Sequence, residues 1–314
     1  MDLSIIICTY NRAQVLKRTL ESIKGLIVPQ GLAWEILVVD NNSSDATKEV
    51  AADVARGGKI PVKYLSEPRQ GKSGALNTGV RESSGDIVAF VDDDMTFDEG
   101  YLRSVAEAAN KYPEAAGFGG KILINWPIPK PDWIIMEGPY RNIDGTIGYR
   151  DLGDINNDFS SINSLPSGGN MFFKRKIFTM GNYFSEDLGP AGDRMSYGED
   201  EEFCRRLLKS GSKLYYIAKT IVYHNIPEEK ASKRYFCRRR HDAARDSIIF
   251  AKEASDTARM FGVPRYLFYY YIVYLTQWFF SVNARRRFFY KLKLCSVIGQ
   301  IEGYRKVIPR VDKR

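Results

Sequence analysis

Apolar and polar positions alternate in long blocks over the first 125 residues of the 314-residue chain. Apolar runs of strand length lie at residues 3–10, 34–41, 62–67, 86–94 and 118–124. Amphipathic stretches with helical periodicity lie between them, at residues 12–25, 44–57, 72–85 and 97–113. Three of these stretches stop at or near Gly and the last stops at Pro, as helices do. Near-continuous apolar strands separated by helices predict a parallel sheet covered on both faces, the doubly wound α/β class.

Periodicity is weaker in the middle of the chain. Residues 125–165 combine Trp126 and Trp133 with several Pro and Gly residues, which predicts a long functional loop over a binding site. An amphipathic helix is predicted before the stop at Gly211, and a strand is predicted over 213–224.

The predicted strands of the first part end in polar and acidic residues. These strand ends are residues 9–12, 40–42, 67–69 and 92–94. Ligands of doubly wound sheets bind beyond the carboxyl ends of the strands, so these residues are expected to line a site. The first strand is not followed by GxGxxG, so the dinucleotide fingerprint is absent and a different nucleotide is implied.

Three consecutive carboxylates, Asp92, Asp93 and Asp94, follow the apolar run at 86–94. Crowded carboxylates repel one another and raise each other's pKa unless a cation lies between them. Oxygen ligands of this kind suit Mg²⁺ or Mn²⁺, which in turn bridge phosphates. The alternative is that the acids begin a loop and cap the next helix, but capping accounts for one carboxylate and not for three.

Six motifs carry a family resemblance. They are TYNR, VVDNNSSD, RQGKSGALNTGV, FVDDDM, GGNMFFKR and GEDEEFCRRLLKSGSKL, in this order. Together they resemble the family 2 glycosyltransferases, which have the GT-A fold. The resemblance implies an inverting transfer of sugar from a UDP-, GDP- or dTDP-sugar, with Mn²⁺ or Mg²⁺. A glycan or lipid-linked hydroxyl would be the acceptor, in polysaccharide, glycolipid or other cell-envelope glycan synthesis.

The resemblance also implies roles for single residues. The donor-binding residues would be Thr9, Tyr10, Arg12, Asp40, Arg69, Lys72, Asp92 and Asp93. The first four would hold the base and ribose, and the next two would lie near the nucleotide. Asp92 and Asp94 match the acids of the DxD motif, and Asp94 would bind the metal together with Asp92 and His224. Acceptor-binding residues would be Asn170, which could instead be a turn asparagine, and Trp133. His224 could likewise be an ordinary core residue.

The resemblance covers about residues 3–225 and implies a catalytic domain over 1–225. Residues 1–125 would form its nucleotide-sugar-binding half and residues 126–225 its acceptor-binding half. A basic, aromatic-rich helical extension would follow at 226–314.

The reaction itself requires a base. An alcohol that displaces a nucleoside diphosphate must lose a proton, and the leaving group needs a stabilising positive charge. The carboxylates of GEDEE, which precede an amphipathic helix with Phe203 and Leu207 one turn apart, are the candidates. Asp200 is preferred because it matches the family's Glu-Asp motif, and Glu199 is the second choice. Acids in a first helical turn can also merely offset the helix dipole.

Composition adds a compartment and a charge asymmetry. The four cysteines have no CxxC spacing and the N-terminus has no signal-peptide pattern, so a cytoplasmic, reducing compartment is expected. Residues 1–202 hold 21 Lys and Arg against 30 Asp and Glu, a net charge of −9. Residues 203–314 hold 25 against 8, a net charge of +17. The two parts are therefore expected to face different partners.

The stretch 266–283 carries no charge and is followed by Arg285, Arg286, Arg287, Lys291 and Lys293. Its tyrosines, Thr and Gln make it too polar for a comfortable membrane span, whereas Tyr and Trp suit the lipid interface. We therefore expect association with the anionic inner face of a cell membrane, with packing inside the protein or against a second subunit as the alternative.

Two other classes of protein were weighed. The Gly71-Lys72-Ser73 sequence resembles a phosphate loop, but Ser66 stands where the P-loop ATPases need Gly. A nucleic-acid-binding protein could use the basic C-terminal part, but no recognition motif accompanies the charge, so no nucleic-acid partner is expected.

Overall fold

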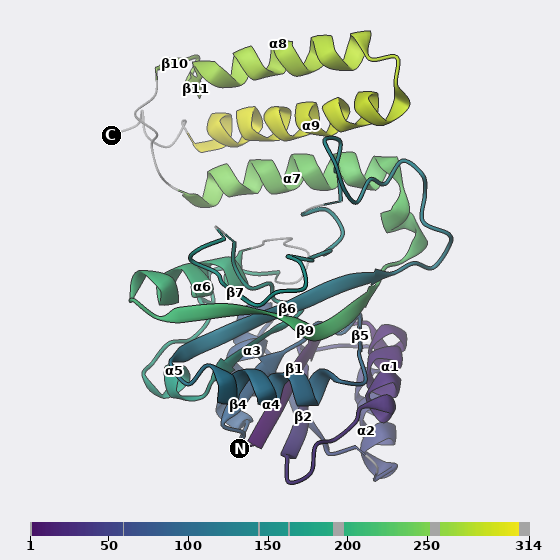
Figure 1. Ribbon diagram of the computed structural model, residues 1–314, viewed down its shortest axis with the longest axis vertical. Helices are drawn as coiled ribbons and strands as arrows, with labels where there is room; N and C mark the ends of the chain where they lie inside the picture. The colour runs from purple at the N-terminus through teal and green to yellow at the C-terminus, as the bar shows by residue number, and fades with distance from the viewer. Residues whose placement is uncertain are drawn as a thin grey trace. The chain divides into compact units, whose positions relative to one another are not determined.

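The computed structural model describes residues 2–58, 60–143, 145–162, 164–190, 198–251 and 258–307 (Figure 1). The chain divides into two compact units. The sheet unit comprises Met1–Asn125 and Arg150–Asn225, and the helical unit comprises Trp126–Tyr149 and Ile226–Arg314. The stretch 126–149, which the resemblance assigns to the acceptor-binding half, thus groups with the C-terminal helices.

The sheet unit is built around one mixed sheet. Its strands are β1 (Asp2–Thr9), β2 (Ala33–Asp40), β3 (Val62–Ser66), β4 (Ile87–Phe90), β5 (Met95–Phe97), β6 (Ala115–Asn125), β7 (Asn157–Asp158), β8 (Met171–Lys174) and β9 (Lys213–Asn225). The order is β3-β2-β1-β4-β8-β6-β9-β5, and β7 pairs with β9. The helices are α1 (Ala13–Ser22), α2 (Thr47–Arg56), α3 (Lys72–Glu82), α4 (Tyr101–Lys111), α5 (Lys176–Thr179) and α6 (Glu199–Lys209), with the 3₁₀ turn η1 (Ile23–Gly25).

The predicted α/β class is confirmed, and its parallel part is formed by β1 to β4. Strand β1 pairs in parallel with β2 and with β4, and β2 pairs in parallel with β3. The sheet as a whole is mixed, because β8 lies between β4 and β6 and is antiparallel to both. Strand β6 then pairs in parallel with β9.

Each face of the sheet carries its own apolar core, as the alternation of side chains along a strand requires. Leu3, Ile5 and Ile7 of β1 belong to a core shared with α1, α2 and α4. Ile6 points the other way, into a core shared with α3, α5 and α6. Helices therefore cover both faces of the sheet.

The end of β4 is fixed by its last residue. Phe90 is fully buried and makes edge-to-face contacts with Phe173, Phe178 and Phe184, whose ring centroids lie 5.2 to 6.1 Å away. Such a cluster adds geometric specificity to apolar burial. The strand predicted at 86–94 is shorter in the structure: β4 ends at Phe90, and the three aspartates form the connection between β4 and β5.

The helical unit contains η2 (Glu228–Ala231), α7 (Lys233–Ala251), β10 (Arg259–Met260), β11 (Val263–Pro264), α8 (Arg265–Phe280) and α9 (Ala284–Val307). Helices α7 and α9 approach closely because Gly299 and Gly303 of α9 face the α7 backbone. A Cβ atom at Gly299 would lie 2.1 Å from the His241 carbonyl oxygen, and one at Gly303 would lie 2.7 Å from that of Arg245. Leu267 of α8 and Val297 of α9 share a further apolar cluster.

Candidate active site

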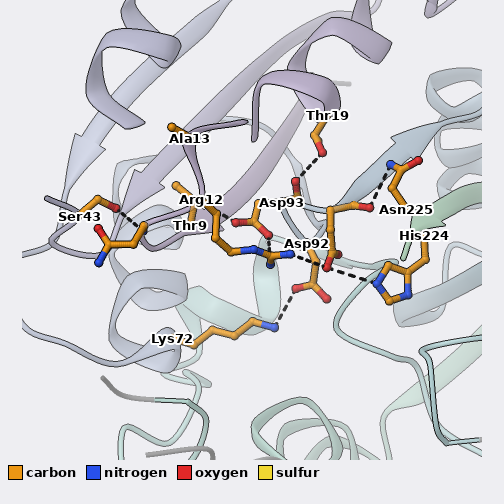
Figure 2. A network of polar contacts seen from close by, with 12 residues as sticks. Thr9, Arg12, Ala13, Thr19, Ser43, Lys72, Asp92, Asp93, His224 and Asn225 are labelled. Carbon is orange, nitrogen blue, oxygen red and sulfur yellow. Dashed lines mark hydrogen bonds and ion pairs between the residues drawn. The ribbon is translucent and has the colours of Figure 1, made fainter. Parts of the chain in front are cut away.

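The Asp93 carboxylate is buried in the turn after β4, where two donors hold it (Figure 2). Thr9 Oγ1 donates to Asp93 Oδ2 at 2.7 Å, and Arg12 Nη1 donates to Asp93 Oδ1 at 2.5 Å. Thr19 Oγ1 of α1 donates to the Asp93 carbonyl oxygen at 2.6 Å. Burial raises the pKa of Asp93 to about 7, although the Arg12 guanidinium acts in the opposite direction. Thr9 and Arg12 thus lie at the acidic turn itself.

Asp94 meets His224 at the neighbouring edge of the site. Strand β9 pairs with β5 in a register that sets His224 opposite Met95, and His224 Nε2 lies 3.3 Å from Asp94 Oδ2. Arg12 Nη2 also donates to Asp94 Oδ2, at 3.0 Å. The backbone N–H and side-chain Nδ2 of Asn225 both donate to the Asp94 carbonyl oxygen, which holds the turn against β9 (Figure 2).

The predicted metal ligands are not all gathered at one point. Asp94 and His224 supply a carboxylate and an imidazole side by side, a donor pair suited to a divalent cation. Asp92 instead forms an ion pair with Lys72. Within the described part of the chain, His, Cys, Asp and Glu side chains form no group of three or more with the spacing of a metal site. Asp94 and His224 are thus the adjacent residues that would hold a divalent cation.

Lys72 connects the acidic turn to the predicted base. It begins α3 directly after Gly71, whose φ of 149° favours glycine at that position. Lys72 Nζ lies 2.8 Å from Asp92 Oδ1 (Figure 2). It also lies 3.3 Å from Glu199 Oε1. Burial lowers the Lys72 pKa, but the two carboxylates outweigh it and hold this pKa well above the ordinary value. The ammonium group is therefore a fixed positive charge between the acidic turn and the first residue of α6.

Glu199 and Asp200 open α6 but face different surroundings. Glu199 is buried against Lys72, and burial raises its pKa. Asp200 is only half-buried, and its Oδ2 accepts the backbone N–H of Gly168 at 2.7 Å. The Asp200 Oδ1 accepts the N–H of Glu201 at 2.8 Å. Two neighbouring residues thus have distinct settings, one in an ion pair and one at a surface open to a substrate.

Gly168 and Gly169 lie next to the carboxylates of Asp200 and Asp92, a role that the motif GGNM did not by itself predict. A Cβ atom at Gly168 would lie 3.3 Å from Asp200 Oδ2. A Cβ atom at the next residue, Gly169, would lie 3.3 Å from Asp92 Oδ2 and 2.7 Å from the Met95 methyl group. Asp200 and Asp92 therefore approach the same two-residue segment. The GG pair in GGNM was the available signal, because paired glycines mark places where other groups come close.

Asp200 also borders a cavity of about 470 Å³ in the sheet unit. Its lining includes the cations Arg150, Arg205 and Lys209 and the ring of Phe159. Arg150 Nη1 donates to Ser164 Oγ at 2.7 Å, and Arg205 forms an ion pair with Glu201. A cavity of this size can admit a sugar unit, and Asp200 is the carboxylate at its edge that lies nearest the Gly168–Gly169 segment.

The remaining donor-binding candidates lie at or just after the ends of the neighbouring strands β1, β2 and β3. Asp40 is buried at the end of β2, where it accepts the Ser43 N–H at 2.9 Å and the Tyr64 hydroxyl at 2.8 Å. Tyr10 is exposed at the end of β1. Arg69 is exposed and lies 3.4 Å from a carboxylate oxygen of Glu67. Their roles toward base and ribose remain predictions.

Asn170 lies in the core of the sheet unit. Its side chain is fully buried, and its Nδ2 donates to the carbonyl oxygens of Lys121 and Thr220, at 3.0 and 2.9 Å. The pairing of β6 with β9 shifts register between Gly120 and Lys121, so an ordinary ladder is interrupted at this point. The Asn170 amide thus donates hydrogen bonds to carbonyl groups beside an irregularity in the strand pairing.

We expect Asn170→Ala to lower the free energy of unfolding of the sheet unit by about 1–3 kcal/mol, because two buried carbonyl groups lose a donor. Asn157→Ala is the matched control, since the Asn157 amide donates to one carbonyl in an exposed setting and should change little. Chemical denaturation measures both. Equal stability of the two variants would contradict the structural role of Asn170 and favour the acceptor contact.

Trp133, the second acceptor-binding candidate, belongs to the helical unit. Its ring packs edge-on against Phe236 and Phe288, with centroids 4.9 and 5.0 Å away, and Lys233 Nζ lies 5.9 Å from its centroid. The residue is half-buried and anchors the stretch 126–149 to α7 and α9. Its contact with an acceptor remains a prediction.

The fold and the site together define a class. A doubly wound sheet that gathers an acidic turn, two cations and a helix-borne carboxylate at its strand ends is suited to bind a diphosphate and to activate a hydroxyl. The structure is similar to the mannosyltransferase PcManGT from Pyrobaculum calidifontis in complex with GDP-Man and Mn²⁺. The TM-score is 0.54 at 19% identity, and the match covers 78% of this chain and 61% of that chain. This likeness shows the GT-A fold.

The profile of the family described as "Glycosyl transferase family 2" matches residues 4–179, more than half of the chain. The chain belongs to this family, and the protein is a glycosyltransferase. The succinoglycan biosynthesis protein ExoM of Rhizobium meliloti is 24% identical over 241 residues, 76% of this chain and 72% of that protein. The glucosyl-dolichyl phosphate glucuronosyltransferase of Haloferax volcanii is 24% identical over 230 residues, which are 73% of this chain and 70% of that protein. Family membership sets aside the ATPase alternative.

Proposed function

We propose that the protein transfers a sugar, with inversion, from a nucleoside diphosphate sugar to an acceptor hydroxyl, and that Asp200 is the base. The observation that carries this proposal is the approach of Asp200 and Asp92 to the adjacent glycines Gly168 and Gly169. A donor diphosphate at the acidic turn and a hydroxyl at Asp200 would then meet across this segment. Inversion requires such an arrangement, because the attacking and leaving oxygens lie on opposite sides of the anomeric carbon.

Asp200 suits the base role better than Glu199 for a geometric reason. The Glu199 carboxylate lies 3.3 Å from Lys72 Nζ, so its charge is engaged in an ion pair inside the protein. Asp200 borders the cavity and is held by backbone donors from Gly168 and Glu201. A carboxylate held in one orientation at an open surface can accept a proton from a bound hydroxyl.

The chain brings its own cations to the place where the leaving diphosphate would develop charge. Lys72 and Arg12 both lie within 3.0 Å of aspartate oxygens of the turn. Asp94 and His224 would hold Mn²⁺ or Mg²⁺, which would supply further stabilisation of negative charge on the leaving group. Lys72 would orient the diphosphate from the α3 side, and Arg12 would keep Asp93 and Asp94 in place.

The proposed acceptor is a glycan or a lipid-linked sugar used in cell-envelope glycan synthesis. The names of two relatives support this class, one for succinoglycan biosynthesis and one for a glucosyl-dolichyl phosphate. The cavity beside Asp200 offers aromatic and cationic side chains, including Phe159 and Arg150, to such an acceptor.

A donor screen tests the proposal. The purified protein would be incubated with UDP-, GDP- and dTDP-sugars and Mn²⁺ or Mg²⁺, and release of nucleoside diphosphate would be measured, with ATP as the control substrate. We expect hydrolysis or transfer with one nucleotide class and none with ATP. The anomeric configuration of the product, read by NMR, should be opposite to that of the donor. Release of phosphate from ATP without activity on any sugar nucleotide would contradict the proposal.

A further inference from the structure

A second cavity, of about 540 Å³, lies wholly within the helical unit. Three cations line it, Arg141, Arg240 and Lys293, together with the rings of Tyr270 and Phe289. The described residues that line it include no carboxylate. Three positive charges in one concave site, with no acidic side chain on its wall, favour an anionic ligand.

The cations of this cavity are held by their surroundings. Arg240 Nη2 donates to the Asn142 carbonyl oxygen at 3.4 Å, and the Arg141 guanidinium lies 5.7 Å from the centroid of Tyr149. Lys293 Nζ lies 5.4 Å from the centroid of Phe289. Guanidinium groups placed in this way bind phosphate oxygens through paired N–H donors. The chemistry of the cavity therefore suits a phosphate group attached to an apolar or amphipathic body.

Helix α8, which contributes one wall of the cavity, exposes apolar and aromatic side chains along its other face. Tyr269, Ile272, Phe279 and Phe280 are 64%, 61%, 67% and 76% exposed. The opposite face, which includes Leu267, packs against α9. A stripe of large side chains in water needs a partner to cover it. None of the described helices is long and apolar enough to cross a membrane.

The charges around this stripe indicate the chemistry of the partner. Arg285, Arg287 and Lys291 follow α8 at the start of α9 and are exposed. If a second copy of the chain covered the stripe through the same face, the cations of the two copies would lie near each other and repel one another. An anionic lipid surface meets both features, because aromatic side chains suit the zone between headgroups and acyl chains and cations attract the headgroups.

We propose that the cavity lined by Arg141, Arg240 and Lys293 binds the phosphate headgroup of an anionic lipid while the exposed face of α8 lies in the interface of the membrane. The lipid is held at one defined place, in addition to the general attraction between a basic protein and an anionic surface. The inference concerns the helical unit alone and does not depend on the sugar-transfer proposal, because its test measures vesicle binding.

Co-sedimentation of the full chain with vesicles tests the proposal. The vesicles would be pure phosphatidylcholine, or phosphatidylcholine with a fifth of phosphatidylglycerol, at low and at high salt. We expect binding to the anionic vesicles only. The double variant Arg141→Gln, Arg240→Gln should weaken this binding at least tenfold at both salt concentrations, because both residues line the cavity and are half-buried, and contacts of half-buried charges are screened less than those on an exposed surface.

The double variant Arg285→Gln, Lys291→Gln is the matched control. It removes the same charge from the same unit, but neither residue lines the cavity. Its binding should fall only a few-fold at low salt and remain like the wild type at high salt. Thermal unfolding would show that both variants are folded. Equal losses of vesicle binding in the two variants would mean that only the overall positive charge of the surface matters, and this would overturn the proposal. A failure of the wild type to bind anionic vesicles would overturn it as well.

Inorganic phosphate distinguishes a lipid from a free phosphate ligand. Added at a concentration that leaves the ionic strength matched, it should compete weakly with vesicles, since it lacks the apolar part that α8 would contact. Protection of the wild type against thermal unfolding by phosphate alone, without any vesicle binding, would assign the cavity to a soluble phosphate ligand and contradict the lipid proposal.

Discussion

Asp200→Asn should lower the turnover number of sugar transfer by at least about a hundredfold and leave the affinity for donor nearly unchanged. The asparagine keeps the size of the side chain, and its one amide oxygen can still accept one of the two backbone N–H groups, of Gly168 and Glu201, that the aspartate oxygens accept. What the carboxamide loses is the ability to take a proton from the acceptor hydroxyl. Initial rates over a range of donor and acceptor concentrations would separate the turnover number from KM.

Glu199→Gln is the matched control for this prediction, because it makes the same chemical change one residue earlier. Glu199 lies 3.3 Å from Lys72, and Lys72 contacts Asp92, so we expect weaker donor binding and a smaller loss of turnover. The two variants should thus differ in kind: one affects kcat and the other KM for donor. If Glu199→Gln shows the kcat loss and Asp200→Asn does not, the base is Glu199.

Asp94→Asn should abolish detectable transfer, and it should also remove the effect of the metal on nucleotide binding. We expect the wild type to bind the nucleoside diphosphate at least tenfold more tightly with Mn²⁺ or Mg²⁺ than with a chelator, because the metal neutralises the diphosphate. In the variant, the affinities with and without metal should be nearly equal. Isothermal titration calorimetry measures all four values and does not depend on catalysis.

Asp98→Asn provides the control for Asp94→Asn. Asp98 lies four residues further along the chain, where its Oδ1 accepts the Gly100 N–H at 2.9 Å, and it does not contact His224 or Arg12 in any described interaction. This variant should keep the metal effect and the transfer rate. Wild-type protein that retains its rate after treatment with chelator would contradict the role of a metal at Asp94.

Local patterns were sufficient for the parallel part of the fold. The apolar runs and amphipathic stretches predicted β1 to β4 and α1 to α4, because burial on both faces of a sheet leaves a signal in neighbouring residues. The element boundaries were less well defined. The predicted helix at 97–113 begins only at Tyr101, since Met95–Phe97 pairs with β9, a strand far away in the sequence.

The sequence by itself also identified the family and the residue types of the site. Six motifs in order pointed to family 2 glycosyltransferases, and the acidic turn at 92–94 and the GEDEE segment were singled out for their chemistry. Strand ends collect polar residues because buried strand interiors exclude them, so the chemistry of an α/β site is visible in sequence.

Only the tertiary structure decided which of these groups meet. In the structure Asp92 contacts Lys72, Asp93 contacts Arg12 and Asp94 contacts His224. The fold also places Asp200 beside Gly168. These contacts depend on the antiparallel entry of β8 between β4 and β6 and on the register of β9 against β5. Pairing between strands that lie far apart in the chain leaves no periodic signal in either sequence. The side chains of a strand inside the sheet are buried to a similar extent whichever strand lies beside it. For that reason the sequence could supply candidate residues for the site, whereas the contacts between them could not be predicted from it.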